Sequence, residues 1–229
     1  DEIQMVDEFM DVLNSLLHLD NVDVYVTGSN SHFLSNDIVT EFRDRSDEIH
    51  MYPFSFSEYY EAVGGDRHEA WKDYYTYGGL PHLLTLVGDK KKSDYLNSVY
   101  RKTYLTDIKE RHDIKEHEFE ELIKMLSSSI GSPCNPNRLT NTFKSKINVD
   151  LSYPTVVKYI DYLKDSFLIE EAERYDIKGR KYIGSLSKYY FWDIGVRNTI
   201  LNFRQQEENH IMENILYNER RMRGYNVDV

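Results

Sequence analysis

Apolar residues recur at helical spacing near the start of the chain and alternate with short runs typical of strands. Residues 5–18 place apolar side chains every three or four positions, which predicts an amphipathic helix. The β-branched and aromatic run 22–27 predicts a strand, residues 31–42 fit a second helix, and residues 48–52 fit a second strand. Strand, helix, strand in this order is the α/β pattern that builds a parallel sheet.

Helical patterns dominate from Ser57 onwards. Ser57 is a candidate N-cap for the first of these helices, and residues 77–81, with two glycines and a proline, predict a break. Further helices are predicted over residues 93–111, 117–130, 138–147, 154–167 and 207–222, and strands over residues 168–175, 188–192 and 225–229. The chain should therefore begin as α/β and continue as a mostly helical protein.

One stretch of the second half has a recognisable layout. The helix over 138–147 is followed by a turn and by the helix over 154–167, for which Ser152 is a candidate cap. The two extended segments that follow flank a basic turn around residues 178–181. Helix, turn, helix and β-hairpin is the layout of a winged helix-turn-helix.

Charge divides the chain into unlike halves. The 229 residues carry 28 Lys+Arg and 39 Asp+Glu, which gives a net charge of −11. Residues 1–110 hold 10 of the basic and 21 of the acidic residues, so the whole excess (10 − 21 = −11) lies in the first half. A net charge of −11 argues against nucleic-acid binding only for that half, because residues 111–229 are neutral. Two modules with different partners explain the asymmetry, and two simply solvated halves are the alternative.

Composition narrows the class of protein. The hydrophobic fraction is 40% and the charged fraction 29%, which is ordinary globular usage. No run approaches the roughly 18 apolar residues of a membrane span, so we expect no membrane partner. The single cysteine, Cys134, excludes an internal disulfide framework and fits a reducing compartment, so we expect a cytoplasmic protein. No His/Cys cluster has the spacing of a zinc site.

Several short motifs follow one another in a specific order. They are Asp1-Glu2-Ile3-Gln4, Thr27-Gly28-Ser29-Asn30-Ser31, Tyr52-Pro53-Phe54-Ser55-Phe56-Ser57-Glu58-Tyr59, Tyr77-Gly78-Gly79-Leu80-Pro81, residues 188–198 and residues 213–219. This order resembles the second half of an AAA+ ATPase core, as found in ATP-binding proteins whose C-terminal region is the domain of unknown function 4143. The resemblance covers essentially all 229 residues.

The resemblance implies roles for residues of the first half. Asp1 is then the Walker B acid that faces Mg²⁺, and Glu2 is the base that activates water for ATP hydrolysis. Ser29 and Asn30 are then the sensor beside the γ-phosphate, whereas without the family they read as a simple turn.

An arginine of the first half is the candidate for a contact between subunits. Arg45 matches the family arginine that acts as an arginine finger on a neighbour's nucleotide, which implies a homo-oligomer. This chain has Asp44 where the family usually has glycine, and pairing with Asp44 would weaken Arg45, so Arg43 is the alternative.

The sequence contains no glycine-rich phosphate loop of the G-x-x-x-x-G-K-[ST] type. ATP and Mg²⁺ are therefore expected as cofactors of a longer parent protein, and none is expected for this chain, which should not hydrolyse ATP. The resemblance divides the chain into the C-terminal part of an AAA+ core (1–56), a helical lid (57–112), a winged-helix domain (113–187) and a truncated restriction-endonuclease-like region (188–229).

The winged-helix candidate supplies the expected nucleic-acid contacts. Lys158 on its second helix and Lys178, Arg180 and Lys181 in the hairpin are placed to contact the phosphates of duplex DNA. Tyr153, Thr155, Tyr162 and Lys164 are further candidates on that helix. A scaffold that binds protein instead of DNA is the alternative. Glu213 is a candidate first acid of the nuclease-like region, with a solvated surface role as its alternative.

Overall fold

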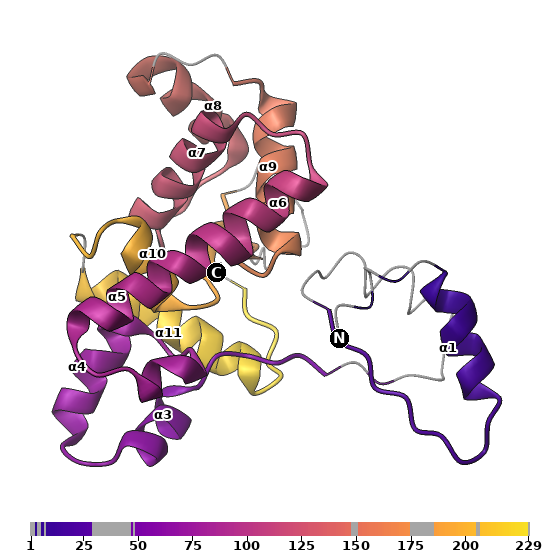
Figure 1. Ribbon diagram of the computed structural model, residues 1–229. Helices are drawn as coiled ribbons and strands as arrows, with labels where there is room; N and C mark the ends of the chain where they lie inside the picture. The colour runs from indigo at the N-terminus through magenta and orange to yellow at the C-terminus, as the bar shows by residue number, and fades with distance from the viewer. Residues whose placement is uncertain are drawn as a thin grey trace. The chain divides into compact units, whose positions relative to one another are not determined.

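The computed structural model describes residues 3, 6, 8–28, 47, 49–147, 151–174, 186–204 and 207–228 (Figure 1). The chain forms two compact units. The first comprises residues 1–50 with 165–167, and the second comprises residues 51–164 with 168–229. Each unit is described by itself.

The first unit contains helix α1, Phe9–Leu17, which confirms the helix predicted from the spacing of residues 5–18. Phe9 and Leu13 are buried on one face of α1 and pack against Val24 and Val26. The described residues 22–28 and 49–52 carry no strand, in contrast to the prediction. β-branched residues favour a strand only where a neighbouring strand pairs with them. Among the described residues of this unit, the Ile3 N–H donates to Thr27 O at 3.0 Å.

The second unit begins with two short helices, α3 (Phe56–Val63) and α4 (Arg67–Tyr77). The N-cap of α3 is Ser55, not the predicted Ser57. The reason is a capping box: Ser55 Oγ accepts the Glu58 N–H, and the Glu58 carboxylate accepts the Ser55 N–H at 2.8 Å. The predicted break after Tyr77 is confirmed, since Gly78 ends α4 with φ +83°.

A long helical rod follows the turn of 3₁₀-helix at Pro81–Thr85. The rod consists of α5 (Asp89–Ser98), a π-helical segment (Val99–Thr106) and α6 (Asp107–Arg111), and these run on without a break (Figure 1). It confirms the helix predicted over 93–111 and begins four residues earlier.

Three further helices and two strands come next. They are α7 (Glu116–Ser128), α8 (Pro136–Thr142) with the π-helical segment Phe143–Ile147, α9 (Tyr153–Asp165), β1 (Ile169–Ala172) and β2 (Lys188–Phe191). The start of α8 lies two residues before the predicted one, because Asn135 caps it by accepting the Arg138 N–H at 2.8 Å. Ser152 caps α9 as predicted, with its Oγ accepting the Thr155 N–H at 3.4 Å.

Strands β1 and β2 form an antiparallel two-stranded sheet. Ile169 pairs with Phe191 and Ala172 with Lys188. The sheet is extended by an isolated bridge in which Cys134 and Ser187 exchange both backbone hydrogen bonds at 2.8 Å. The segment before α8 is thus joined to the segment that leads into β2.

Two helices complete the described chain, α10 (Ile194–Ile200) and α11 (Glu208–Met222). A continuous hydrophobic core runs through the second unit, from Tyr59 on α3 through Phe119 on α7 to Ile215 on α11. The strand predicted at 225–229 is absent from its described residues, 225–228. The described residues therefore form a mostly helical protein with one small sheet.

Candidate functional site

The residues expected to handle ATP lie outside the described ones. They are Asp1, Glu2, Ser29, Asn30 and Arg45, together with the alternative Arg43. Two of their sequence neighbours are described, and they meet: Ile3 donates its N–H to the carbonyl of Thr27 at 3.0 Å. The segment that begins with the candidate acids is therefore bonded to the segment that leads to the candidate sensor.

The exposed cation on α9 is Lys158, as expected for a group that contacts phosphate. Its Nζ lies 5.6 Å from the centre of the Tyr162 ring, and this contact raises the pKa of Lys158. Tyr162 also stacks on His112 with ring centres 3.6 Å apart. The Tyr162 ring is thus half-buried, with one face stacked on His112.

The second predicted cation of α9 is not free for phosphate. Lys164 Nζ lies 2.9 Å from Glu171 on β1 and 3.7 Å from Asp161 on its own helix. These two carboxylates balance its charge, so the basic face of α9 is confined to its first half. The hairpin residues Lys178, Arg180 and Lys181 lie outside the described residues, between β1 and β2.

Glu213 on α11 joins α11 to β2. Its Oε1 accepts hydrogen bonds at 2.6 Å from Lys188 Nζ and from the Tyr190 hydroxyl. Burial raises the pKa of Glu213, but the bonds from Lys188 and Tyr190 outweigh burial and leave the pKa below its usual value. Glu213 is therefore a paired carboxylate that fixes packing, rather than the solvated acid of the simpler interpretation.

A buried acid, Asp193, joins parts of the chain that are far apart in sequence. Its side chain caps α10 by accepting the Val196 N–H at 2.9 Å and also accepts the Gly79 N–H at 2.8 Å. Burial raises the pKa of this carboxyl to about 6, although the hydrogen bonds from Gly79, Val196 and Gly195 act to lower it. Two of the motifs noted in the sequence, around residues 77–81 and 188–198, thus meet at one carboxylate.

The glycines of these motifs permit the approach of α10 to the end of α4. A Cβ on Gly195 would lie 1.8 Å from Tyr77 O, and one on Gly79 would lie 2.3 Å from Phe54 O. Phe54 donates its N–H to Gly79 O at 2.8 Å and accepts the Tyr74 hydroxyl at 2.8 Å. A third motif, at residues 52–59, therefore belongs to the same junction. The motifs are brought together for packing, and their sequences did not signal that contact.

Arg197 on α10 extends this buried polar junction. Its Nε donates to Ser127 O at 2.8 Å, and its Nη1 donates to the Asn198 side chain at 2.9 Å. The Asn198 amide in turn donates to the carbonyls of Tyr75 and Thr76 at 3.0 Å. Burial lowers the pKa of Arg197 to about 10. These bonds connect α10 to the C-terminal ends of α4 and α7.

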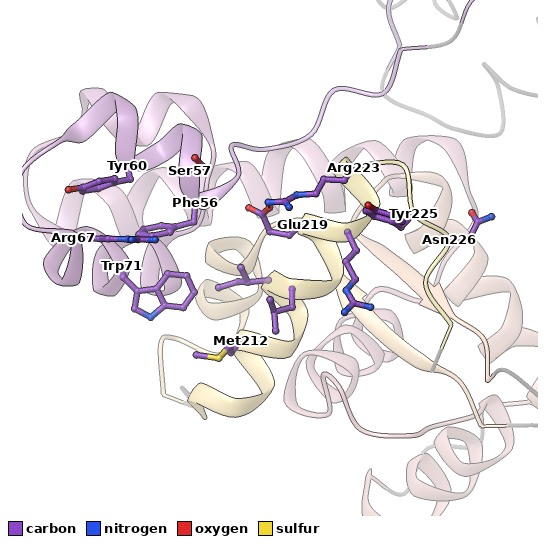
Figure 2. Close-up of a pocket in the computed structure, with 13 residues that line it drawn as sticks. Phe56, Ser57, Tyr60, Arg67, Trp71, Met212, Glu219, Arg223, Tyr225 and Asn226 are labelled. Carbon is purple, nitrogen blue, oxygen red and sulfur yellow. The ribbon is translucent and has the colours of Figure 1, made fainter.

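An open groove of about 930 Å³ lies between α3 and α4 on one side and α11 with the residues after it on the other (Figure 2). Aromatic and cationic residues line it, among them Trp71, Arg67 and Arg220. Sequence reasoning missed this groove because its lining comes from segments about 150 residues apart. The helical pattern of α11 marked its buried face, and the apolar Met212 and Leu216 on the adjoining face were the available signal.

Comparison with known proteins places this chain in a family. A family model described as a domain of unknown function, DUF8612, matches residues 68–207, which is more than half of the chain. The chain belongs to the DUF8612 family. A second family model, for an AAA domain, matches residues 1–60. No solved structure matches the chain.

Two curated relatives match the DUF8612 chain over nearly its whole length. An uncharacterized protein of Haemophilus influenzae is 33% identical over 235 residues, which cover all of the chain and 58% of that relative. An uncharacterized protein of Methanocaldococcus jannaschii is 26% identical over 240 residues, which cover 98% of the chain and 53% of that relative. The chain thus spans little more than half the length of these relatives.

These matches bear on the resemblance seen in the sequence. The AAA match at residues 1–60 supports an AAA-type protein. The domain that follows is DUF8612, whereas the motifs resembled the domain of unknown function 4143. Among the described residues of this DUF8612 chain, no group of three or more His, Cys, Asp or Glu side chains is placed to hold a metal ion. No described helix has the length and apolar character of a membrane span.

Proposed function

We propose that this chain acts within an ATPase that couples ATP binding and hydrolysis to the binding of DNA or of a protein partner. The AAA match at residues 1–60 is the observation that carries the ATPase part, and the hydrogen bond between Ile3 and Thr27 joins the two segments that hold its candidate residues. In this proposal Asp1 holds Mg²⁺, Glu2 activates water, and Ser29 and Asn30 sense the γ-phosphate. These roles come from the family resemblance, and the 229 residues themselves supply no phosphate loop.

The ATPase proposal is tested in two proteins. The 229-residue chain is expected to show no Mg²⁺-dependent ATP turnover. In the full-length protein, Glu2→Gln is expected to preserve ATP binding and to lower turnover by about 100-fold or more, because a positioned base contributes roughly 10²–10⁴ in rate. Turnover that Glu2→Gln leaves unchanged would contradict the role of Glu2.

The arginine finger has a matched pair of variants. Arg45→Ala in the full-length protein is expected to lower turnover without lowering ATP affinity, and mixing with active subunits should show that the arginine acts on a neighbour. Arg43→Ala is the control. If Arg43→Ala alone lowers turnover, the finger is Arg43, and if neither does, the proposed homo-oligomeric site is wrong.

The DNA-binding part of the proposal rests on the order of elements in the second unit. Helices α7, α8 and α9 are followed by the antiparallel pair β1 and β2. The residue Cys134, which lies between α7 and α8, pairs with Ser187 just before β2 and so extends this sheet by one bridge. Three helices and a small sheet in this order support a winged helix-turn-helix, whose wing would be the basic segment between β1 and β2. Lys158 on α9 and Lys178, Arg180 and Lys181 would contact phosphates.

Duplex DNA binding is tested by salt titration. The chain is expected to bind a mixed-sequence duplex with an affinity that falls steeply with salt, and the triple variant Lys178→Ala/Arg180→Ala/Lys181→Ala should reduce the slope by about 2 to 3. The control Lys90→Ala/Lys91→Ala/Lys102→Ala removes three exposed charges from the helical rod formed by α5, the π-helical segment and α6, and it should leave the slope unchanged. Equal slopes in both variants would exclude the wing as the DNA contact.

A protein-binding scaffold is the second candidate. The observation that favours it is the state of α9, where Lys164 is paired with Glu171 and Tyr162 is covered by His112. A helix whose second half is already packed has little surface left for a DNA groove. Absence of duplex binding at low salt would favour this candidate.

The remaining assignments are also proposals. The helical lid at 57–112 and the nuclease-like region at 188–229 follow the same resemblance, and a cytoplasmic location follows from the single cysteine. In the nuclease-like region, the contacts of Glu213 favour a role in packing over metal binding, because Lys188 and Tyr190 both donate hydrogen bonds to its Oε1.

A further inference from the structure

The floor of the groove is an exposed apolar stripe on α11. Met212 and Leu216, four residues apart and so on the same face, expose 45% and 56% of their surface. The adjoining face of α11, with Ile211 and Ile215, is buried in the core, and Ile215 also reaches the groove. This helix is therefore apolar on two faces, of which the described part of the chain covers only one.

The wall beyond α11 is held in place by backbone hydrogen bonds. Gly224 adopts φ +79°, its N–H donates to Arg221 O at 2.9 Å, and the N–H of Tyr225 donates to Arg220 O at 3.0 Å. These two bonds form a Schellman motif, which reverses the chain at the end of the helix. The reversal brings Tyr225 and Asn226 to the edge of the groove (Figure 2).

The opposite wall is aromatic, but its rings are packed on one another. Phe56 meets Trp71 edge to face at 4.9 Å and also contacts Tyr60 and Tyr74. Trp71 contacts Tyr74 and Tyr75 as well. A stack of bases needs several open ring faces, whereas these rings already contact one another and the floor of the groove is aliphatic. The groove is therefore better suited to protein side chains than to nucleic acid.

Charge indicates the kind of protein segment that fits. The groove is lined by Arg67, Arg220 and Arg223 and by one acid, Glu219 (3 − 1 = +2), in a chain of net charge −11. Glu219 is held by Arg223 at 3.1 Å. Arg67 lies over the Phe56 ring at 6.0 Å, and neither Arg67 nor Arg220 forms an ion pair with another described residue.

We propose that this groove is a docking site for an acidic amphipathic helix of a partner protein. Apolar side chains of the partner helix would pack on Met212 and Leu216, and its flanking carboxylates would pair with Arg67 and Arg220. A helix laid in an apolar groove is a common mode of peptide recognition, and arginine and aromatic residues dominate the energetics of such interfaces. This site is independent of the ATP and DNA contacts proposed above.

The experiment uses three probes against the full 229-residue chain. The first is a fluorescein-labelled 16-residue helical peptide with leucines spaced i, i+4 and glutamates on either side of the leucine stripe. The second carries lysine in place of every glutamate, and the third is a 15-nucleotide oligo-dT. Anisotropy at low salt is expected to show binding of the acidic peptide at least about tenfold tighter than the basic one, with a difference that shrinks as salt is added.

Groove variants with matched controls locate the binding. Leu216→Asp and Arg220→Glu are each expected to weaken the acidic peptide by about tenfold or more. Val87→Asp and Arg101→Glu introduce the same acidic side chains at exposed positions outside the groove and should leave binding unchanged. Circular dichroism confirms that each variant is folded.

Three results would overturn the proposal. The first is equal or absent binding of the two peptides, and the second is acidic-peptide binding that the groove variants do not weaken. The third is binding of another occupant that Arg220→Glu abolishes. Loss of oligo-dT binding would assign the groove to nucleic acid, and loss of self-association would assign it to a second copy of the chain.

Discussion

The buried carboxyl of Asp193 should make the stability of this protein depend on pH in a defined direction. Replacement of Asp193 by Asn removes the titrating group and keeps an oxygen that accepts the Val196 N–H. The folded-state pKa is about 6, against 3.8 for the ordinary carboxyl. The native protein therefore binds this proton more tightly than the unfolded chain does, so Asp193 favours folding most at low pH and loses that contribution as pH rises through about 6.

The size of the effect follows from the two pKa values. The difference between a pKa of about 6 and one of 3.8 corresponds to roughly 3 kcal/mol. Between pH 4.5 and pH 7.5, the linkage relation gives a loss of about 2 kcal/mol in the wild type relative to Asp193→Asn. At any one pH, the stability of Asp193→Asn also depends on its altered bond to Gly79. That bond does not titrate, so it does not affect how the difference in stability between the two proteins changes with pH.

Urea unfolding of both proteins at several pH values measures this difference. The free energy of unfolding of the wild type, minus that of Asp193→Asn, should fall as pH rises from 4.5 to 7.5. Asp94→Asn, which removes an exposed carboxylate on α5, is the control and should change stability by less than about 0.5 kcal/mol. A difference that is flat or that rises with pH would refute the reasoning, since it would mean that backbone hydrogen bonds outweigh burial at Asp193.

Three further substitutions test the packing, each by urea unfolding. Gly195→Ala should destabilise by at least about 2 kcal/mol, because its Cβ would lie 1.8 Å from Tyr77 O, and a smaller cost would show that α10 can move away. Ser55→Ala should cost about 1 kcal/mol through loss of the capping box, and no cost would mean that the box is not formed. Asn214→Ala should cost about 1–3 kcal/mol, because the buried N–H of Phe191 loses its acceptor at 2.7 Å, and a neutral result would mean that the N–H finds another acceptor.

Helices were predictable from this sequence because their signals are local. The spacing of Phe119, Leu122 and Leu126 shows which face of α7 is buried, and that pattern needs no knowledge of the rest of the fold. Helix starts were less predictable where two serines compete. Ser55 and Ser57 are both good caps, and Glu58 decides between them because it stands three residues after Ser55.

Strands were predictable only where the sequence also supplied the partner. The extended runs around residues 169 and 190 pair with each other, and both were predicted. The run 22–27 has the same β-branched composition, but it forms no strand in the described part of the chain. Composition indicates which residues suit a strand, whereas pairing depends on contacts that are distant in sequence.

The candidate sites depended least on local signals. Lys164 was a candidate for DNA contact on the basis of its place on the helix, but Glu171 from β1 pairs with it at 2.9 Å. Glu213 was noted as an acid, and its pairing with Lys188 and Tyr190 required the fold. The groove between α4 and α11 combines residues 67 and 220, a separation that no periodic pattern can reveal.

The bond between Gly79 and Asp193 also sets the order of events during synthesis. The two residues are 114 positions apart, and ribosomes add about 5–20 residues per second, so roughly 6 to 23 s separate their appearance. For that time the end of α4 lacks its acceptor for the Gly79 N–H, and the surface that will receive α10 stays open. In a nascent chain paused before residue 193, the surface at the end of α4 would therefore stay exposed. Chaperones and proteases can recognise that surface until α10 is made and packs on it.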